Sequence, residues 1–187
     1  MSEQAAPARQ TAEDVLAFWL AAGPDRWFEH DEAFDAVVRE HFAATYEEAA
    51  AGLMNAWADA PESALALVIV LDQFPRNMFR GSARCFAADT LARAAAERAI
   101  ARGFDRKVGL PERQFFYLPF EHSEQLADQE RAVALMRETG DADLLKWAEL
   151  HADIIRRFGR FPHRNAALGR TSTPEEQAFL DDGGFSG

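Results

Sequence analysis

The amino-acid sequence predicts an all-α protein with about seven or eight helices. Apolar side chains recur three and four residues apart, which places them on one face of a helix. Cap-forming residues precede many of these segments, and glycine follows them. No segment alternates apolar and polar residues for long, and no pattern of strand, helix and strand occurs. The length of 187 residues suits a single domain.

Composition and net charge restrict the classes of molecule that the protein is expected to bind. The chain is 48% hydrophobic and 27% charged, as ordinary globular proteins are, and its formal net charge is −11. Binding to nucleic acid or to an anionic membrane needs basic surface. We therefore expect neither kind of partner.

The cellular compartment follows from two further features. Cys85 is the only cysteine, which excludes an internal disulfide and a cysteine-rich zinc site. The N-terminus lacks the basic and then apolar pattern of a signal peptide, and no apolar run approaches the roughly 20 residues that span a bilayer. We expect a soluble, cytoplasmic protein.

The first helices are marked by their caps. Residues 1–10 lack periodicity and are expected to be a mobile tail. Thr11 caps the first helix, with Asp14 at the third position as in a capping box, and Gly23-Pro24 ends it. Asp31 caps the second helix, in which apolar side chains form one stripe as far as about residue 51.

The third helix is the centre of the predicted fold. Residues 64–71 have no polar side chain, so a helix here would be hydrophobic all round and therefore buried. Asp59 is expected to cap it, and Pro75 to end it, because proline lacks an N–H and crowds the preceding turn. A buried helix that ends in charged groups must pair them or open them to a cleft. The polar residues that follow the apolar run are Asp72, Gln73, Arg76, Asn77 and Arg80.

The second half of the chain continues the helical pattern. Gly103 is a candidate left-handed cap, Asp141 precedes an apolar stripe, and Thr173 opens a capping box with proline at the first position. Helices are expected at 86–102, 111–118, 121–138, 142–158 and 175–180. The domain would span residues 11–182, and the Gly-rich end, 183–187, would be frayed.

Several separated motifs resemble one bacterial protein family. They are Leu71-Asp72-Gln73-Phe74-Pro75-Arg76-Asn77, Pro119-Phe120-Glu121-His122-Ser123-Glu124, His151, Arg160-Phe161-Pro162-His163-Arg164-Asn165 and Leu168-Gly169-Arg170. In this order they resemble domain-of-unknown-function family 924, over nearly the whole chain. The resemblance implies a single-domain, tetratricopeptide-like helical bundle and a shared site, and it carries no assigned activity.

His122, His151 and Glu121 are the candidates for acid/base chemistry. Histidine titrates near neutral pH without perturbation, so either histidine could transfer a proton while Glu121 orients it. Glu121 and Glu124 have an alternative role as capping groups, because the helix dipole stabilises carboxylates near a helix N-terminus. His151 lies on an otherwise apolar helix face, where the alternative is a hydrogen-bonded core residue.

Basic and amide side chains follow Phe-Pro at two places, residues 74–77 and 161–165. Arginine presents a planar fork that suits carboxylate and phosphate, and asparagine adds neutral hydrogen bonds. The alternative is internal, with Arg76 or Arg164 pairing with a carboxylate of the chain and holding helices together. The candidate ligand-binding residues are Arg76, Asn77, Arg80, Arg160, His163, Arg164 and Asn165.

Other chemistry has little support in the sequence. There is no Gly-rich phosphate loop, no Gly-x-Ser-x-Gly elbow and no His-Glu-x-x-His helix. The Glu-x-x-His pairs of di-iron bundles are also missing. We therefore expect no metal ion and no cofactor.

These observations lead to one hypothesis and one alternative. The hypothesis is a pocket between helices, lined by arginine, histidine, glutamate and asparagine, that binds a small anionic ligand such as a carboxylate or a phosphate. If the protein is an enzyme, its chemistry would be cofactor-free acid/base catalysis. The alternative is a tetratricopeptide-like module that binds a protein segment or a peptide carboxylate without catalysis.

Overall fold

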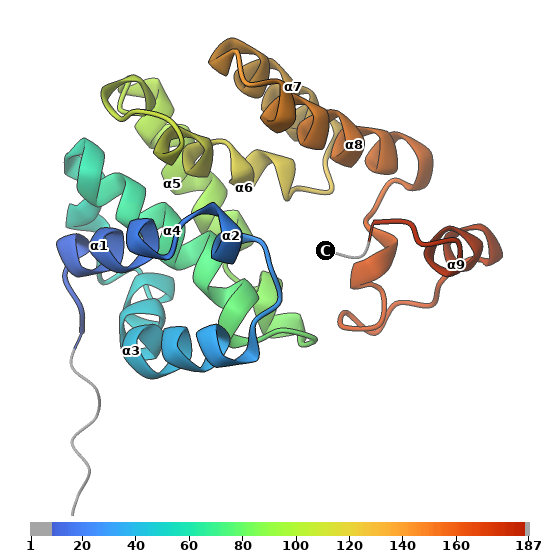
Figure 1. Cartoon of the computed structure of the whole chain (residues 1–187), viewed down its shortest axis with the longest axis horizontal. Coiled ribbons are helices and arrows are strands. Elements are labelled where there is room, and N and C mark those ends of the chain that lie inside the picture. The colour runs from blue at the N-terminus through green and yellow to red at the C-terminus, as the bar shows by residue number, and fades with distance from the viewer. Residues whose placement is uncertain (1–8, 186–187) are drawn as a thin grey trace, which may run out of the picture. The chain divides into compact units, whose positions relative to one another are not determined.

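The computed structural model describes residues 9–185, and helices are the only regular secondary structure in that range (Figure 1). The predicted all-α fold is confirmed. Nine α-helices occur among the described residues. Two of them, α2 (Pro24–Trp27) and α6 (Leu118–Glu121), have only 4 residues, so the longer helices agree with the predicted number.

The chain forms two compact units. The N-terminal unit contains residues 9–80 and 84–119, and the C-terminal unit contains residues 81–83 and 120–185. The boundaries of the predicted domain stay a prediction. Most of the predicted mobile tail, residues 1–8, lies outside the described residues, as do residues 186–187 of the predicted frayed end.

Two early helices of the N-terminal unit begin at the predicted caps. The Thr11 side chain accepts a hydrogen bond from the Asp14 backbone and the Asp14 side chain accepts one from the Thr11 backbone, which completes the capping box of α1 (Ala12–Ala22). Asp31 accepts from two backbone N–H groups at the start of α3 (Glu32–Ala50). Sequence caps therefore located both helix starts correctly.

The central helix is α4 (Pro61–Met78), which contacts α1, α3 and α5 (Asp89–Ala101). All side chains from residue 64 to residue 75 are buried, as the apolar run predicts. Aromatic rings complete this core. Phe74, for example, packs edge-on against Trp19 at a centroid distance of 5.6 Å.

Two expectations for α4 were wrong. The helix continues through Pro75 to Met78, because packing on three sides outweighs the one backbone hydrogen bond that proline removes. The N-cap is Ala60, which makes no side-chain cap. Asp59 instead ends a preceding 3₁₀ helix, η1 (Asn55–Asp59).

The other 3₁₀ helices are short connections. Residues 83–88 precede α5, which begins later than predicted, and include η2 (Ala83–Phe86). They are followed along the chain by η3 (Asp105–Lys107), η4 (Glu112–Phe116) and η5 (Pro162–Arg164). The aromatic segment predicted as a helix at 111–118 is therefore η4 and the start of α6.

The C-terminal unit is built on α7 (Leu126–Thr139) and α8 (Ala142–Phe158), which pack side by side (Figure 1). Asp141 caps α8 as predicted, and Gly140 and Gly159 end the two helices in the left-handed conformation. A capping box at Thr173 begins α9 (Pro174–Asp181). Ile154, Ile155 and Phe161 form the buried apolar cluster, whereas Trp147 of the same helix, α8, is 47% exposed.

The helix predicted at 121–138 is interrupted. The chain leaves helical structure after Glu121 and resumes it at Leu126. The Gln129 amide donates to the carbonyls of Glu121 and Ser123, both at 2.6 Å, and so satisfies backbone acceptors that a continuous helix would have used. Glu121 is therefore at the end of a helix, and neither it nor Glu124 caps α7, whose N-cap is Gln125.

No helix in the described part of the chain is long and apolar enough to cross a membrane.

Candidate functional site

The predicted site residues divide between the two units. The N-terminal unit holds Arg76, Asn77 and Arg80, all from the end of α4 or just after it. The C-terminal unit holds the others, which are Glu121, His122, His151, Arg160, His163, Arg164 and Asn165.

Arg76 contacts two carboxylates of the N-terminal unit. Its guanidinium forms two hydrogen bonds with Asp89, at 3.1 and 3.2 Å, and lies 3.4 Å from Oδ1 of the fully buried Asp72. It also donates to the Asp72 carbonyl. Burial lowers the pKa of Arg76, but the two carboxylates outweigh it, so the pKa is raised and the guanidinium stays charged.

Asn77 and Arg80 share a different carboxylate. Asp35 on α3 accepts from the Asn77 amide at 2.7 Å and from the Arg80 guanidinium at 2.9 and 3.2 Å. Asp35 is 5% exposed and Asn77 3%. The polar end of α4 is thus joined to α3 and α5 by internal pairs, which is the arrangement the alternative interpretation described.

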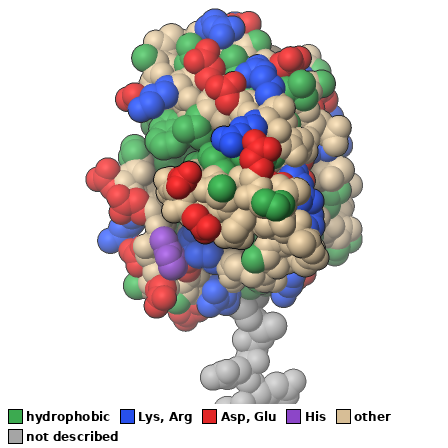
Figure 2. Space-filling view, turned by 90° about the vertical axis from the view of Figure 1, so that its right-hand side faces the viewer, with side chains coloured by type: hydrophobic (Ala, Val, Ile, Leu, Met, Phe, Trp, Pro, Cys, Tyr) green, Lys and Arg blue, Asp and Glu red, His purple; other side chains and the backbone are tan. Residues whose placement is uncertain are grey.

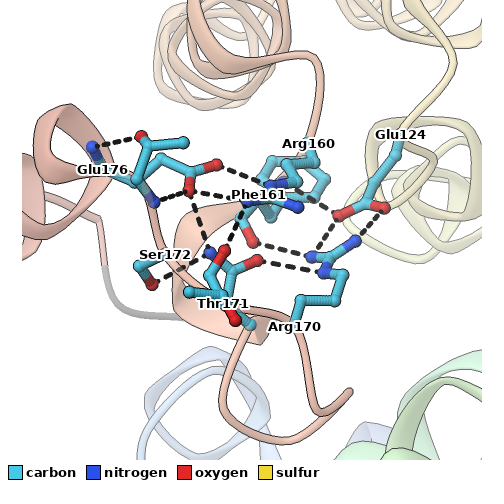
Figure 3. Close-up of polar contacts among 9 residues, drawn as sticks. Glu124, Arg160, Phe161, Arg170, Thr171, Ser172 and Glu176 are labelled. Carbon is cyan, nitrogen blue, oxygen red and sulfur yellow. Dashed lines mark hydrogen bonds and ion pairs between the residues drawn. The ribbon is translucent and has the colours of Figure 1, made fainter.

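A second network lies in the C-terminal unit, around Glu124 (Figure 3). Arg170 donates to both Glu124 oxygens, at 2.8 and 2.9 Å, and the backbone N–H of Phe161 donates to one of them at 2.8 Å. Burial would raise the pKa of Glu124, but these hydrogen bonds outweigh it, so the pKa is lowered. Glu124 therefore stays ionised and fixes the loop that begins at Phe161.

Glu176 holds the other side of that loop (Figure 3). Arg160 donates to its two oxygens at 2.6 and 2.8 Å, and the Asn165 amide donates at 3.2 Å. The hydrogen bonds from Arg160 lower the pKa of Glu176 to about 2, against the opposing effect of burial. Asn165 also accepts from Arg170 at 3.0 Å, so it connects the two ion pairs.

The acid/base candidates Glu121 and His151 meet. Glu121 Oε1 lies 2.9 Å from His151 Nδ1, and the carbonyl of Trp147 lies 2.8 Å from the same nitrogen. Both side chains are buried, with exposures of 3% for Glu121 and 7% for His151. Because Nδ1 faces two oxygen acceptors, it carries a proton, and proton exchange is left to Nε2.

Two phenylalanine rings contact His151, and the ring of His163 contacts both of them. His151 contacts Phe161 and Phe185, at centroid distances of 5.7 and 4.5 Å, and His163 contacts the same two phenylalanines at 5.5 and 5.2 Å. The Arg164 guanidinium lies over the Phe161 ring, 4.5 Å from its centroid. Phe161 thus brings His151, His163 and Arg164 into one region, in which the Arg164 guanidinium is a permanent positive charge.

His122 lies in the turn after α6 and is partly buried. Among residues 9–185, no three His, Cys, Asp or Glu side chains are grouped so that they could hold a metal ion.

Sequence reasoning missed several partners of the predicted residues. These are Asp35, Asp89, Arg170, Glu176 and Phe185. Arg170 was within a recognised motif, and Glu176 carried the signal of a capping box. Asp35 and Asp89 are ordinary acidic residues of helix sequences, and Phe185 follows two glycines at a chain end. No local pattern marks these three.

The fold and the site define an all-α protein with a buried carboxylate–histidine pair beside a network of arginine–glutamate pairs. A family model described as "Bacterial protein of unknown function (DUF924)" matches residues 15–184, so the chain belongs to this family. The resemblance inferred from the motifs is thereby confirmed.

A solved structure, of a protein of unknown function from Agrobacterium tumefaciens, is similar to this chain. The two sequences are 48% identical, the TM-score is 0.89, and the match covers 91% of this chain and 97% of the other. The comparison with curated proteins found no match.

Proposed function

We propose that the C-terminal unit binds a small anionic ligand, a carboxylate or a phosphate, and that His151 transfers a proton to or from it. The observation that carries this proposal is the buried pair of Glu121 and His151, with its 2.9 Å contact. A carboxylate on one imidazole nitrogen fixes the tautomer and the ring orientation, and it leaves the other nitrogen to exchange a proton with the ligand. Such an arrangement is suited to acid/base catalysis without a cofactor.

The charge of the region supports an anionic ligand. Arg160, Arg164 and Arg170 balance Glu121, Glu124 and Glu176, so these six side chains carry no excess negative charge that would repel an anion. Arg164 and His163 both pack against Phe161, the ring that also contacts His151. Because this places them beside the proposed proton-transfer group, we assign the recognition of the anion to Arg164 and His163. Arg160 and Arg170 donate to Glu176 and Glu124, so we assign a positioning role to them and to Asn165.

Native mass spectrometry of the gently purified protein is the first test, because it reports bound mass and subunit number together. We expect a bound anion that is lost from Arg164→Ala and retained by Arg156→Ala. Arg156 is a matched control, since it belongs to the same helical unit but pairs on the surface with Asp153. Circular dichroism would confirm that both variants are folded. Equal retention of the ligand in both would contradict the proposal.

The proposal that His151 transfers a proton has a separate test. The ¹⁵N NMR spectrum of the histidine rings should show His151 protonated at Nδ1 near neutral pH, and titration with phosphate or acetate should shift its Nε2 resonance. A His151 that carries its proton on Nε2 would argue against the proposed role, because the acceptors at Nδ1 would then be unused.

A second candidate function is a tetratricopeptide-like module that binds a peptide. A groove of about 360 Å³ in the N-terminal unit favours it, because Phe18, Phe34 and Val37 line it and Val37 is 38% exposed. Val37→Glu should then abolish capture of a partner from a cell lysate, whereas Ala36→Glu, at the neighbouring exposed position, should not. Unchanged capture by Val37→Glu would exclude this groove.

The setting that we propose is a bacterial cytoplasm, with neither nucleic acid nor membrane as a partner. The net charge of −11 supports the proposal that neither nucleic acid nor a membrane is a partner. On the face drawn in Figure 2, Lys and Arg side chains are interspersed with Asp and Glu rather than gathered in one basic area.

A further inference from the structure

A groove of about 560 Å³ runs along the C-terminal unit beside α8 and α9. Its apolar wall comes from Leu150, Ile154 and Phe158 of α8, from Phe179 of α9 and from Phe185. This volume is within the range of small-molecule sites, which is about 300–1,000 Å³. The groove is not part of the histidine site described above, and the proposed function does not use it.

One side chain, Phe185, contacts both the groove and the two histidines. Phe185 lines the groove, and its ring also packs edge-on against His151 at 4.5 Å and against His163 at 5.2 Å. Phe185 is only partly buried. Movement of this one ring would therefore extend the groove to the His151 imidazole.

The backbone before Phe185 is shaped to hold the ring there. Gly183 has a φ of +79°, which favours glycine, and the Gly184 N–H donates to the Phe179 carbonyl at 2.9 Å. A Cβ atom on Gly184 would lie 2.5 Å from that carbonyl oxygen and 2.6 Å from the Phe179 ring. Only glycine thus allows residues 183–185 to lie this close to α9.

The charged side chains that line the groove balance in charge, because Lys146 and Arg157 oppose Glu149 and Asp153. Arg157 pairs with Glu175 at 3.1 Å, Asp153 pairs with Arg156 at 2.7 Å, and Glu149 pairs with Arg137 at 3.2 Å. The groove wall therefore attracts an uncharged, apolar group. An anionic group would be attracted instead to the inner end, where the Arg164 guanidinium lies over the Phe161 ring that contacts His151 and His163.

We propose that the groove is the outer half of the ligand site and that the ligand is an aliphatic carboxylate. Its chain would lie against Leu150, Ile154 and Phe179, and its carboxylate would reach His151 and His163 when the Phe185 ring moves aside. This inference rests on the proposed function, because it needs an anion at the histidines. It adds that the anion has an apolar chain, which phosphate and acetate lack.

The test measures dissociation constants for acetate, butanoate, hexanoate and octanoate with the full chain, by NMR titration. Burial of each methylene contributes about 0.8 kcal/mol, so the affinity should rise up to about fourfold with each added CH₂. Butan-1-ol and hexan-1-ol serve as uncharged probes of the same lengths, and both should bind at least tenfold more weakly than the matching carboxylates.

Two other outcomes separate the two proposals. If all carboxylates bind alike, whatever their length, the anion site stands and the groove inference is wrong. If alcohols and carboxylates bind equally tightly and both depend on chain length, the carboxylate assignment is overturned, and the proposed function fails with it.

Substitutions test whether the dependence of affinity on chain length arises in the groove. Leu150→Gln should remove most of the dependence on chain length, whereas Leu53→Gln, at a leucine that is 70% exposed in the N-terminal unit, should leave it unchanged. Phe185→Ala should accelerate association of octanoate, because it removes the ring that closes the inner end. Identical titrations for Leu150→Gln and Leu53→Gln would show that the chain binds elsewhere, and would overturn the inference.

Discussion

The arginines of the candidate site are positioned by carboxylates that are themselves buried or half-buried. Arg76 meets Asp72 and Asp89, and Arg170 meets Glu124, in geometries that use both arms of the guanidinium. Ion pairs of this kind contribute little net stability when formed, yet removing one partner leaves an uncompensated charge. Side chains suited to ligands thus also hold the fold together, and mutations must separate the two roles.

Arg170→Ala should destabilise the protein, by about 2 kcal/mol. This loss of stability is larger than that for breaking an exposed ion pair and smaller than that for breaking a fully buried one. The Arg170 and Glu124 side chains are in between, with exposures of 23% and 26%. Urea denaturation measures the change. Arg137→Ala, whose pair with Glu149 is exposed, should cost less than about 1 kcal/mol. Equal effects of the two substitutions would contradict this view of the Glu124 network.

Glu176 makes stability depend on pH in the acidic range. Its pKa is lowered from 4.5 to about 2 in the folded protein, so the stabilisation is complete above the ordinary pKa and is lost as the pH falls from 4.5 toward 2. Urea denaturation at pH 6 should show Glu176→Gln to be less stable than the wild type, and at pH 2.5 the difference should be smaller. A difference that grows on acidification would have the wrong sign for a lowered pKa.

Helix α8 shows how one element serves both packing and site. Ile154 and Ile155 face the apolar cluster, His151 reaches Glu121 one turn earlier, and Leu150 lines the groove. The left-handed Gly159 then ends the helix and allows the chain to turn into the loop that carries Phe161. The positions of the histidine and of the loop therefore depend on the same helix.

Gly184→Ala should detach the C-terminal segment from α9. The added methyl group has no room beside the Phe179 carbonyl, so we expect a loss of about 1–3 kcal/mol or a local displacement of the segment. Either response should remove the ring-current shift of Phe185 from the His151 ring protons in NMR spectra. Gly109→Ala is the control, because the nearest atom to a Cβ there is a flexible Glu112 oxygen at 3.8 Å. Unchanged His151 shifts in Gly184→Ala would refute this account.

Charge is the property of the whole molecule that most restricts its partners. Thirty-one acidic residues outnumber twenty Lys and Arg residues, and many arginines already pair with carboxylates of the chain. Fluorescence anisotropy with a duplex DNA oligonucleotide near physiological ionic strength should therefore detect no binding. Binding that weakens steeply with added salt would reveal a basic surface and contradict the prediction.

Local signals were sufficient for much of the fold. Capping boxes at Thr11 and Thr173, the cap at Asp31 and the apolar run of α4 are each contained in a few adjacent residues, and all were interpreted correctly. The continuous helix predicted from 121 was wrong, because the Gln129 amide and the Phe161 backbone compete for groups of that segment. Gln129 is 8 positions from Glu121, and Phe161 is 37 positions from Glu124.

By itself, the sequence determined the helical class, the apolar centre, the family motifs and the residue types available for a site, because each depends on local composition and spacing. Only the tertiary structure decided which groups meet. In it, Glu121 contacts His151, Asp35 accepts hydrogen bonds from Asn77 and Arg80, and Phe185 packs against two histidines. The physical reason is that a charged side chain pairs with whichever partner packing brings within about 3 Å, and packing is a property of the whole folded chain.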